Sequence, residues 1–502
     1  MEQENAQLCA DLTSLKQQLE WFKRQLFGTK SEKRLDIDPA VQGNLLAGLG
    51  VLAPPPKDTP TETITYQRRQ KTRDAAVNDS GLRFDDSVPV QTIELSDPTI
   101  DCIPQDQREV IGEKISYRLA QRPGSYLILK YVRPVIKRKD TQAIMSACAP
   151  GNVLDKSSVD VSFLAGMLID KFCYHLPLYR QHQRLAQCGI QVSRSSLTNW
   201  AGRGIDLLIP IVDAQYRHLL QSRVLAMDET PIKAARKSKG KMRQAYFWPM
   251  YGDADEIVFH YAPSREHRHV QTLLGEFQGT LLSDGYEAYA AYARNNDQVT
   301  HAQCWSHCRR GFERAQESEP GAGGEALAII GALYRHEQII RDQKLHGENK
   351  RAYRTKHSEP IVQTFWRWCD AQCQRGDLLP SSPLAKALKY AMSRQVSLQV
   401  FLSDPDVPID TNHLERGLRA IPMGKNNWLF CWTEIGAERV AAIQSLLVTC
   451  KLHGVNPYTY LVDVLQRISE HPASQVVDLT PRVWKAKFSH APMTSDLVLV
   501  NQ

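Results

Sequence analysis

The chain has 502 residues, with 62 Lys and Arg against 55 Asp and Glu, and a formal net charge of +7. Because 42% of its residues are hydrophobic and 23% are charged, the composition excludes a collagen-like or wholly disordered protein. The length predicts about three domains. No apolar run approaches the roughly 20 residues that a membrane-spanning helix needs.

The polar N-terminus predicts no secretory signal. Eleven cysteines without a repeated spacing favour a reducing compartment over a disulfide framework. We therefore expect a cytoplasmic protein with no membrane partner.

Residues 1–35 carry a heptad pattern that predicts an N-terminal coiled coil. The positions in its seam are Met1, Asn5, Leu8, Leu12, Leu15, Leu19, Phe22 and Leu26. Asn5 falls on an a position, where a buried amide fixes register and partner number. This pattern predicts a homo-oligomer, although a helix that packs on its own protein also fits. Residues 36–82, which prolines interrupt, are predicted to form a linker.

The next two segments are predicted to differ in secondary structure. Residues 83–150 contain short β-like runs at 88–95, 114–119 and 126–136, which predict a small β-rich module. Residues 158–222 have a helical pattern in which Cys188-Gly189 forms a turn and Ser193 caps the following helix. This pattern resembles a helix-turn-helix and predicts a helical DNA-binding region. Two packed helices without a DNA role are an equally open interpretation.

From residue 223 the pattern changes to alternating strands and helices. Strands are predicted at 224–227, 245–251, 256–262, 280–283 and 299–304, with helices at 266–274 and 287–294. Three strands, helix, strand, helix, strand is the order of the ribonuclease-H-like fold, a mixed sheet flanked by helices. We therefore assign 223–309 and 406–440 to a catalytic domain of this class and 310–405 to a helical insertion. Residues 441–502 form C-terminal helices and a tail, so the fold class is multidomain α/β.

Two acidic residues end strands that are neighbours in a sheet of this order. Asp228 ends the first strand and Asp284 ends the fourth, so we expect their carboxylates side by side. Such a pair repels unless a cation lies between its members, and hard oxygen ligands suit Mg²⁺ or Mn²⁺. Glu415, in a helix that Asp410 or Asn412 can cap, is the best third carboxylate. One such acid alone is more often a turn former, but the order Asp–Asp–Glu in this fold favours catalysis with two metal ions.

Several sequence blocks are spread in order over nearly the whole chain. They are Leu26-Phe27-Gly28, Lys30-Ser31-Glu32, His175-Leu176-Pro177-Leu178-Tyr179-Arg180-Gln181, Asp228-Glu229-Thr230-Pro231, Asp284-Gly285-Tyr286, Cys304-Trp305-Ser306-His307-Cys308-Arg309-Arg310-Gly311-Phe312, Asn412, Glu415-Arg416, Leu418-Arg419 and Asn427-Trp428-Leu429-Phe430. Together they resemble the large transposase protein of the insertion sequence 66 family, a DDE transposase.

The resemblance implies metal-dependent strand cleavage at the ends of the element and transfer of the 3′-hydroxyl into target DNA. It assigns catalysis and the binding of two Mg²⁺ or Mn²⁺ ions to Asp228, Asp284 and Glu415. It also implies a bacterial protein at the nucleoid, with DNA as its partner and helper proteins of the same element as further partners.

Basic residues near these acids are the predicted DNA contacts, because phosphate neutralisation dominates binding to DNA. One group lies on the first hairpin of the catalytic sheet: Lys233, Arg236, Lys237, Lys239, Lys241 and Arg243. A second group lies in the blocks around the triad: His307, Arg309, Arg310, Arg416, Arg419 and Lys425. A solvated loop is the alternative interpretation of the hairpin cluster.

Two departures from the family pattern affect these expectations. The family's module before the helices carries two Cys-x-x-Cys pairs, whereas here the first pair leaves only Cys102 and the second region, Tyr131-Val132-Arg133, has no cysteine. We therefore predict a degenerate zinc-finger-like module at 83–150 that folds without zinc, or binds it only weakly. The family's Gly-Arg-Lys-Asn run reads Gly424-Lys425-Asn426-Asn427, which loses one positive charge. These losses leave open a catalytically inactive, DNA-binding or regulatory descendant of a transposase. A plain metal-dependent nuclease shares only the fold.

Overall fold

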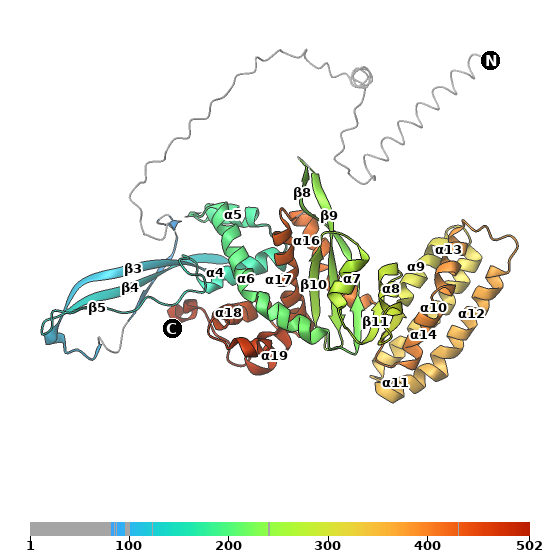
Figure 1. Ribbon diagram of the computed structural model, residues 1–502. Coiled ribbons are helices and arrows are strands. Elements are labelled where there is room, and N and C mark those ends of the chain that lie inside the picture. The colour runs from blue at the N-terminus through green and yellow to red at the C-terminus, as the bar shows by residue number, and fades with distance from the viewer. Residues whose placement is uncertain are drawn as a thin grey trace, which may run out of the picture. The chain divides into compact units, whose positions relative to one another are not determined.

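The computed structural model describes residues 82–501, apart from 85, 87, 96–100, 123, 239–240 and 430. The predicted coiled coil at 1–35 and almost all of the linker at 36–82 therefore lie outside the described residues. In the described part, the chain is mixed α/β with three sheets, which confirms the predicted α/β class (Figure 1). No helix in this part is long and apolar enough to cross a membrane.

The β-rich module is built around one long hairpin. Strand β3 (Arg108–Arg122) pairs antiparallel with β4 (Ser125–Arg138), and β4 also pairs with β2 (Val90–Glu94) and β5 (Ile144–Ser146). A register shift between Val110 and Gly112 marks a bulge in β3. Because a bulge reverses the alternation of side chains, the sequence pattern predicted only the part of β3 beyond it.

The helical region between the two larger sheets agrees with the prediction. It comprises α4 (Val161–Phe172), α5 (Leu178–Gln187) and α6 (Arg194–Leu219). Gly189 has a φ of 77°, as the turn requires, and the side chain of Ser193 accepts a hydrogen bond from the backbone N–H of Ser196 at 3.0 Å. The short strands β1 (Arg83–Phe84) and β6 (Ile190–Gln191) pair and tie this region to the chain that precedes it.

The central sheet has the strand order β10-β9-β7-β11-β12, with β8 paired to β9. The strands are β7 (Val224–Met227), β8 (Thr230–Ser238), β9 (Lys241–Gly252), β10 (Ile257–Ala262), β11 (Gly279–Ser283) and β12 (Val299–Gln303). Strand β7 is antiparallel to β9 and parallel to β11, so the predicted first and fourth strands are neighbours. Helices α7 (His267–Leu274) and α8 (Glu287–Arg294) also form where they were predicted.

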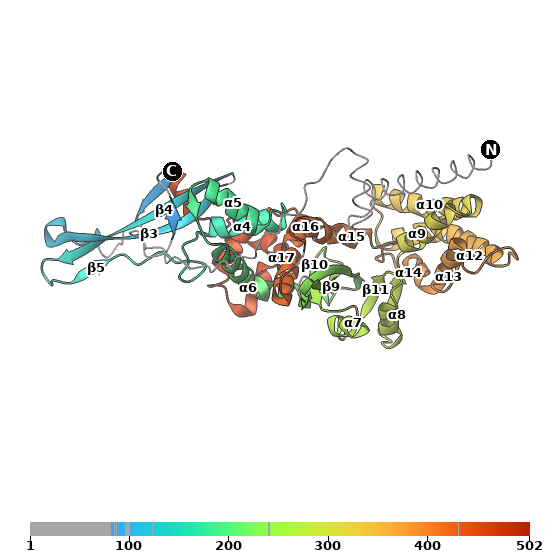
Figure 2. The ribbon, with the colours of Figure 1, turned by 90° about the horizontal axis from the view of Figure 1, so that it is seen from above.

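An all-helical segment interrupts the chain after β12, as predicted. It begins at Trp305 rather than at residue 310 and comprises α9 (Trp305–Gln316), α10 (Pro320–Asp342), α11 (Gly347–Tyr353), the π-helical turn η2 (Arg354–Ser358), α12 (Glu359–Cys373), α13 (Pro383–Met392) and α14 (Gln395–Ser403). Figure 2 shows these helices gathered in one bundle, and α14 packs against β12. Aromatic rings fill the bundle, with the centroids of Trp305 and Phe365 5.2 Å apart.

After the bundle the chain returns to the central sheet and then ends in helices. These are α15 (Asn412–Leu418), α16 (Ala420–Trp428), α17 (Glu434–Leu452), α18 (Pro457–Arg467), η3 (Ala473–Leu479), α19 (Pro481–Lys487) and η4 (Asp496–Asn501).

Helix α17 covers the edge strand β10 and belongs with the central sheet. The hydroxyls of Ser445 and Thr449 accept hydrogen bonds from the backbone N–H groups of Phe259 and Ile257 at 2.9 and 3.2 Å. These contacts satisfy donors that an open sheet edge leaves unpaired. The predicted boundary between 440 and 441 therefore cuts through a single helix. Residues 443–450 are buried on every side of α17.

Candidate active site

Asp228 and Asp284 emerge together at one edge of the central sheet. Asp228 follows β7 and Asp284 follows β11, and these strands are parallel neighbours in register from Val224 and Thr280 onward. Parallel strands bring their carboxyl ends to the same edge, so the predicted pair forms.

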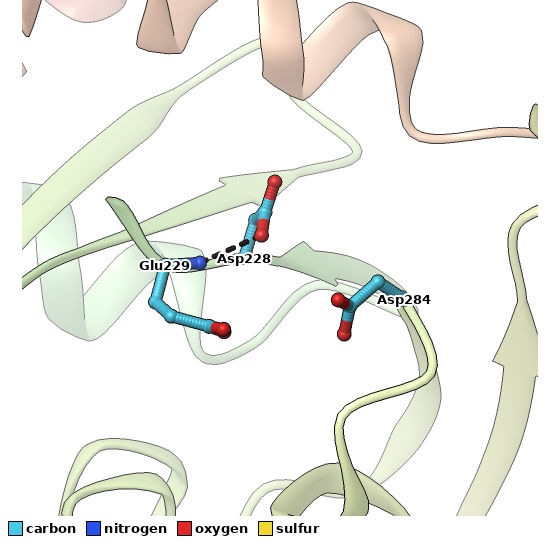
Figure 3. A group of neighbouring side chains, drawn as sticks. All are labelled: Asp228, Glu229 and Asp284. Atoms are coloured by element: carbon cyan, nitrogen blue, oxygen red, sulfur yellow. Dashed lines mark hydrogen bonds between the residues drawn. The ribbon is translucent and has the colours of Figure 1, made fainter. Parts of the chain in front are cut away.

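A third carboxylate joins them. One carboxylate oxygen each from Asp228, Glu229 and Asp284 lies within 4.8 Å of the others, and Figure 3 shows the three side chains around one space. Glu229 was not predicted as a site residue, although it follows Asp228 directly in the sequence. In a regular strand the two side chains would point to opposite faces. Strand β7 ends at Met227, however, and both acids lie in the corner before β8, where each has an oxygen near Asp284.

Local hydrogen bonds fix the two aspartates. Asp228 Oδ1 accepts the backbone N–H of Glu229 at 2.8 Å, and Asp284 Oδ1 accepts the backbone N–H of Tyr286 at 2.8 Å. Both residues thus also stabilise turns, as aspartates at the ends of strands most often do. The turn role and a ligand role are compatible because these bonds hold the carboxylates beside each other.

Burial and like charge disfavour the ionised forms of Asp228 and Glu229. Burial, followed by the charge of Glu229, raises the pKa of Asp228 to about 7. Burial also raises the pKa of Glu229, against the hydrogen bond from the Tyr289 hydroxyl at 2.7 Å and the ion pair with Arg265. The carboxylate oxygens of the three acids lie close together, and a bound cation would offset the repulsion between their charges. Oxygen ligands of this kind suit a hard divalent cation such as Mg²⁺ or Mn²⁺.

Glu415 lies near this cluster but outside the group of three. It is in the first turn of α15, whose N-cap residue is Thr411, so the predicted cap at Asp410 or Asn412 is wrong. Asp410 precedes the cap residue, and its Oδ1 accepts the backbone N–H of Asn412 at 3.0 Å. The two carboxylate oxygens of Glu415 accept hydrogen bonds from Arg310 Nη2 at 2.7 and 2.9 Å. The charge of Glu415 still raises the pKa of Asp228. The structure therefore brings Asp228 and Asp284 together, whereas Glu415 forms an ion pair with Arg310 of α9.

His307 and Arg310, which were predicted to contact DNA, lie beside these carboxylates. His307 Nε2 is 3.1 Å from Arg310 Nη1 and 4.0 Å from Glu415 Oε1. Burial, with the neighbouring charge of Arg310, lowers the pKa of His307. His307 is therefore favoured in its neutral form, and Arg310 carries the positive charge at this point.

The remaining predicted DNA contacts are exposed or half-buried wherever their side chains are described. Lys233, Lys241 and Arg243 are exposed on β8 and β9, while the side chains of Arg236, Lys237 and Lys239 lie outside the described ones. Arg309 pairs with Glu313, and Lys425 Nζ donates to the carbonyl of Pro231 at 3.2 Å. Arg416 and Arg419 are exposed near Glu415 in the sequence.

Comparison with known proteins places the chain in a family. Residues 156–439 match the family described as the Transposase IS66 family, residues 445–481 match the IS66 C-terminal element, and residues 14–92 match a region described as Transposase C of IS166 homeodomain. Three proteins of Sinorhizobium fredii, each described as uncharacterized, are 28% identical to the chain.

These relatives match over most of their length. The match with y4jD covers 96% of this chain and 97% of the relative, that with y4hP covers 80% and 76%, and that with y4qI covers 76% and 72%. Since the first family match spans more than half of the 502 residues, the chain belongs to the IS66 family of transposases.

Proposed function

We propose that the chain is a DDE transposase with a ribonuclease-H-like catalytic sheet. It would cleave DNA at the ends of an insertion sequence and join the freed 3′-hydroxyl to target DNA. The observation that carries this proposal is the meeting of Asp228 and Asp284 at the carboxyl ends of β7 and β11. Family membership and the order of the strands support it.

Asp228, Asp284 and Glu415 are the residues we propose to hold two Mg²⁺ or Mn²⁺ ions. Such ions, when bound, activate the attacking hydroxyl and stabilise the leaving oxygen of a phosphodiester. Glu229, held by Tyr289 and Arg265, would keep the cluster negative and fix the corner that carries Asp228. Arg310 would orient Glu415 and present a positive charge where a DNA phosphate approaches.

The test is a strand-transfer assay with the purified full-length chain and Mg²⁺ or Mn²⁺. The DNA substrate is an oligonucleotide that carries the sequence flanking the protein's own gene. Joined product from the wild type that disappears in Asp284→Asn, and persists in the exposed control Asp297→Asn, is the expected result. Asp284→Asn removes a carboxylate and keeps the shape of the side chain, so DNA binding should remain.

The other outcomes separate the alternatives. DNA that is bound but never cut, even when the products of the neighbouring genes are added, would identify an inactive regulatory descendant. DNA that is nicked without joining would identify a plain nuclease. Strand transfer at the wild-type rate by Asp284→Asn would contradict the assignment of the triad.

A further inference from the structure

A groove of about 740 Å³ opens beside Asp284, between the loop that follows β11 and helices α9 and α13. Asp284 is one of the residues that line the groove, so the groove reaches the carboxylate cluster. Four cationic side chains line it, from Arg265, Arg310, Arg314 and Lys386, against the two carboxylates of Asp284 and Glu287. Because Glu287 pairs with Arg294, the lining has an excess of positive charge beside the acidic site.

The basic wall follows one face of α9. His307, Arg310, Gly311 and Arg314 all line the groove, and their spacing of three, one and three residues is that of a single helix face. Arg314 lies one turn beyond Arg310, about 6 Å further along the helix axis. Positive charges thus occur on two successive turns of α9, first at Arg310, which pairs with Glu415, and then at Arg314.

Helix α13 supplies the opposite wall because it approaches α9 closely. A Cβ atom at Gly311 would lie 3.2 Å from the Cβ of Ala387, so glycine at this position keeps the two helices close. This contact places Lys386, the neighbour of Ala387, in the lining of the same groove as Arg314. Neither helix was predicted to contribute these two residues to a site.

The four cations differ in their partners. Arg265 pairs with Glu229, and Arg310 pairs with Glu415. Arg314 and Lys386 have exposed side chains, and among the described residues neither side chain forms an ion pair or a hydrogen bond. Two unpaired positive charges in the lining of one groove repel each other, and an anion bound in the groove would offset that repulsion.

We propose that the groove binds the phosphodiester backbone of the DNA strand that leads to the reacting phosphate, with Arg314 and Lys386 as its phosphate contacts. This inference rests on the proposed function, because the carboxylate cluster that the groove reaches through Asp284 is what identifies DNA as the anion. A polymer fits better than a small anion, since the cations continue along α9 from the site outward.

The test compares two full-length double variants with the wild type. Arg314→Ala with Lys386→Ala removes the two proposed contacts, and Arg335→Ala with Lys344→Ala removes the same charge from exposed positions of the insertion outside the groove. The affinity for a labelled duplex with the gene-flanking sequence is measured over a series of salt concentrations, without divalent ions.

Each phosphate contact adds about 0.7–0.9 to the slope of log affinity against log salt, so the groove variant should lose about 1.4–1.8. The control variant should keep the wild-type slope. An equal loss in both variants, or no loss in the groove variant, overturns the proposal. If both double variants unfold at the same temperature as the wild type, the substitutions leave the fold intact.

A strand-transfer assay on the same preparations keeps the two proposals apart. If the wild type joins DNA while the groove variant keeps the wild-type salt slope, the proposal that the groove binds DNA is wrong and the catalytic proposal stands. If the slope falls in the groove variant while the wild type joins nothing, the groove stands and the catalytic proposal fails.

Discussion

At the scale of single residues, Asp228 shows how burial and neighbouring charge set the behaviour of the site. Its pKa is raised from 3.8 to about 7. A carboxyl whose pKa is higher in the folded state stabilises the fold below its unfolded pKa, and this contribution is lost as the pH rises through the folded pKa. Between about pH 4 and pH 7 the free energy of unfolding should therefore fall.

We predict that Asp228→Asn unfolds at a higher temperature than the wild type at pH 8 without divalent ions. The substitution removes a buried negative charge, and the shift corresponds to an effect on the order of a few kcal/mol. Added Mg²⁺ should raise the unfolding temperature of the wild type and leave that of Asp228→Asn nearly unchanged.

Differential scanning fluorimetry across pH and Mg²⁺ concentration measures both effects. The exposed control Asp297→Asn should follow the wild type in each condition. An equal response of the wild type and Asp228→Asn to Mg²⁺ would contradict the role given to Asp228.

At the scale of elements, the sequence predicted structure well where a short segment carries its own signal. The apolar run of β7, the Gly189 turn and the Ser193 cap are such signals, and all three occur. Strand β8 was not among the predicted strands, because its basic residues were interpreted as DNA contacts or a solvated loop. The true extent of α17 was missed because a helix buried on all sides has no polar face to mark it.

One buried ion pair within the insertion could not be predicted from sequence. Arg354 is fully buried and donates to both carboxylate oxygens of Glu337 at 2.8 Å. It also donates to the carbonyls of Phe401 and Val407 at 2.7 and 3.0 Å, and these residues lie where the chain leaves the bundle toward α15. Arg354 thus joins the bundle to the segment that carries Glu415, yet in the sequence it is one of several basic residues.

We predict that Arg354→Met lowers the free energy of unfolding by about 3–5 kcal/mol, because it leaves the charge of Glu337 buried without a partner. The matched control Arg351→Met breaks an exposed pair with Glu348 and should cost less than about 1 kcal/mol. Urea unfolding measures both variants. The pairing would be unimportant if both lost the same amount, and Arg354→Met combined with Glu337→Met should recover part of the loss.

At the scale of the whole molecule, the candidate site combines segments that are distant in the sequence. Asp228 and Asp284 could be placed from strand order alone, since neighbouring parallel strands meet at one edge. The pairing of Glu415 with Arg310 could not, because 105 residues separate them and the packing of α9 and α15 brings them together. Local pattern thus gave Asp228 and Asp284, whereas the corner that adds Glu229 and the packing that pairs Glu415 with Arg310 are tertiary features.

Assembly is the last property that the sequence predicts for the molecule. An insertion sequence has two ends, so a transposase that acts on both would need at least two active sites, and the heptad pattern at 1–35 offers a way to pair chains. Leu12 and Leu15 occupy a and d positions of that pattern. We predict that the wild type sediments as an oligomer and that Leu12→Lys with Leu15→Lys converts it to a single chain, because two charges in the seam repel their counterparts.

Analytical ultracentrifugation of the full-length protein distinguishes the outcomes. Ser14→Lys with Gln17→Lys adds the same charge outside the seam and should leave the oligomer intact. If the wild type already sediments as a single chain, the heptad segment is a helix that packs on its own protein, the alternative that the pattern leaves open. If both lysine variants dissociate, added charge rather than the seam governs assembly.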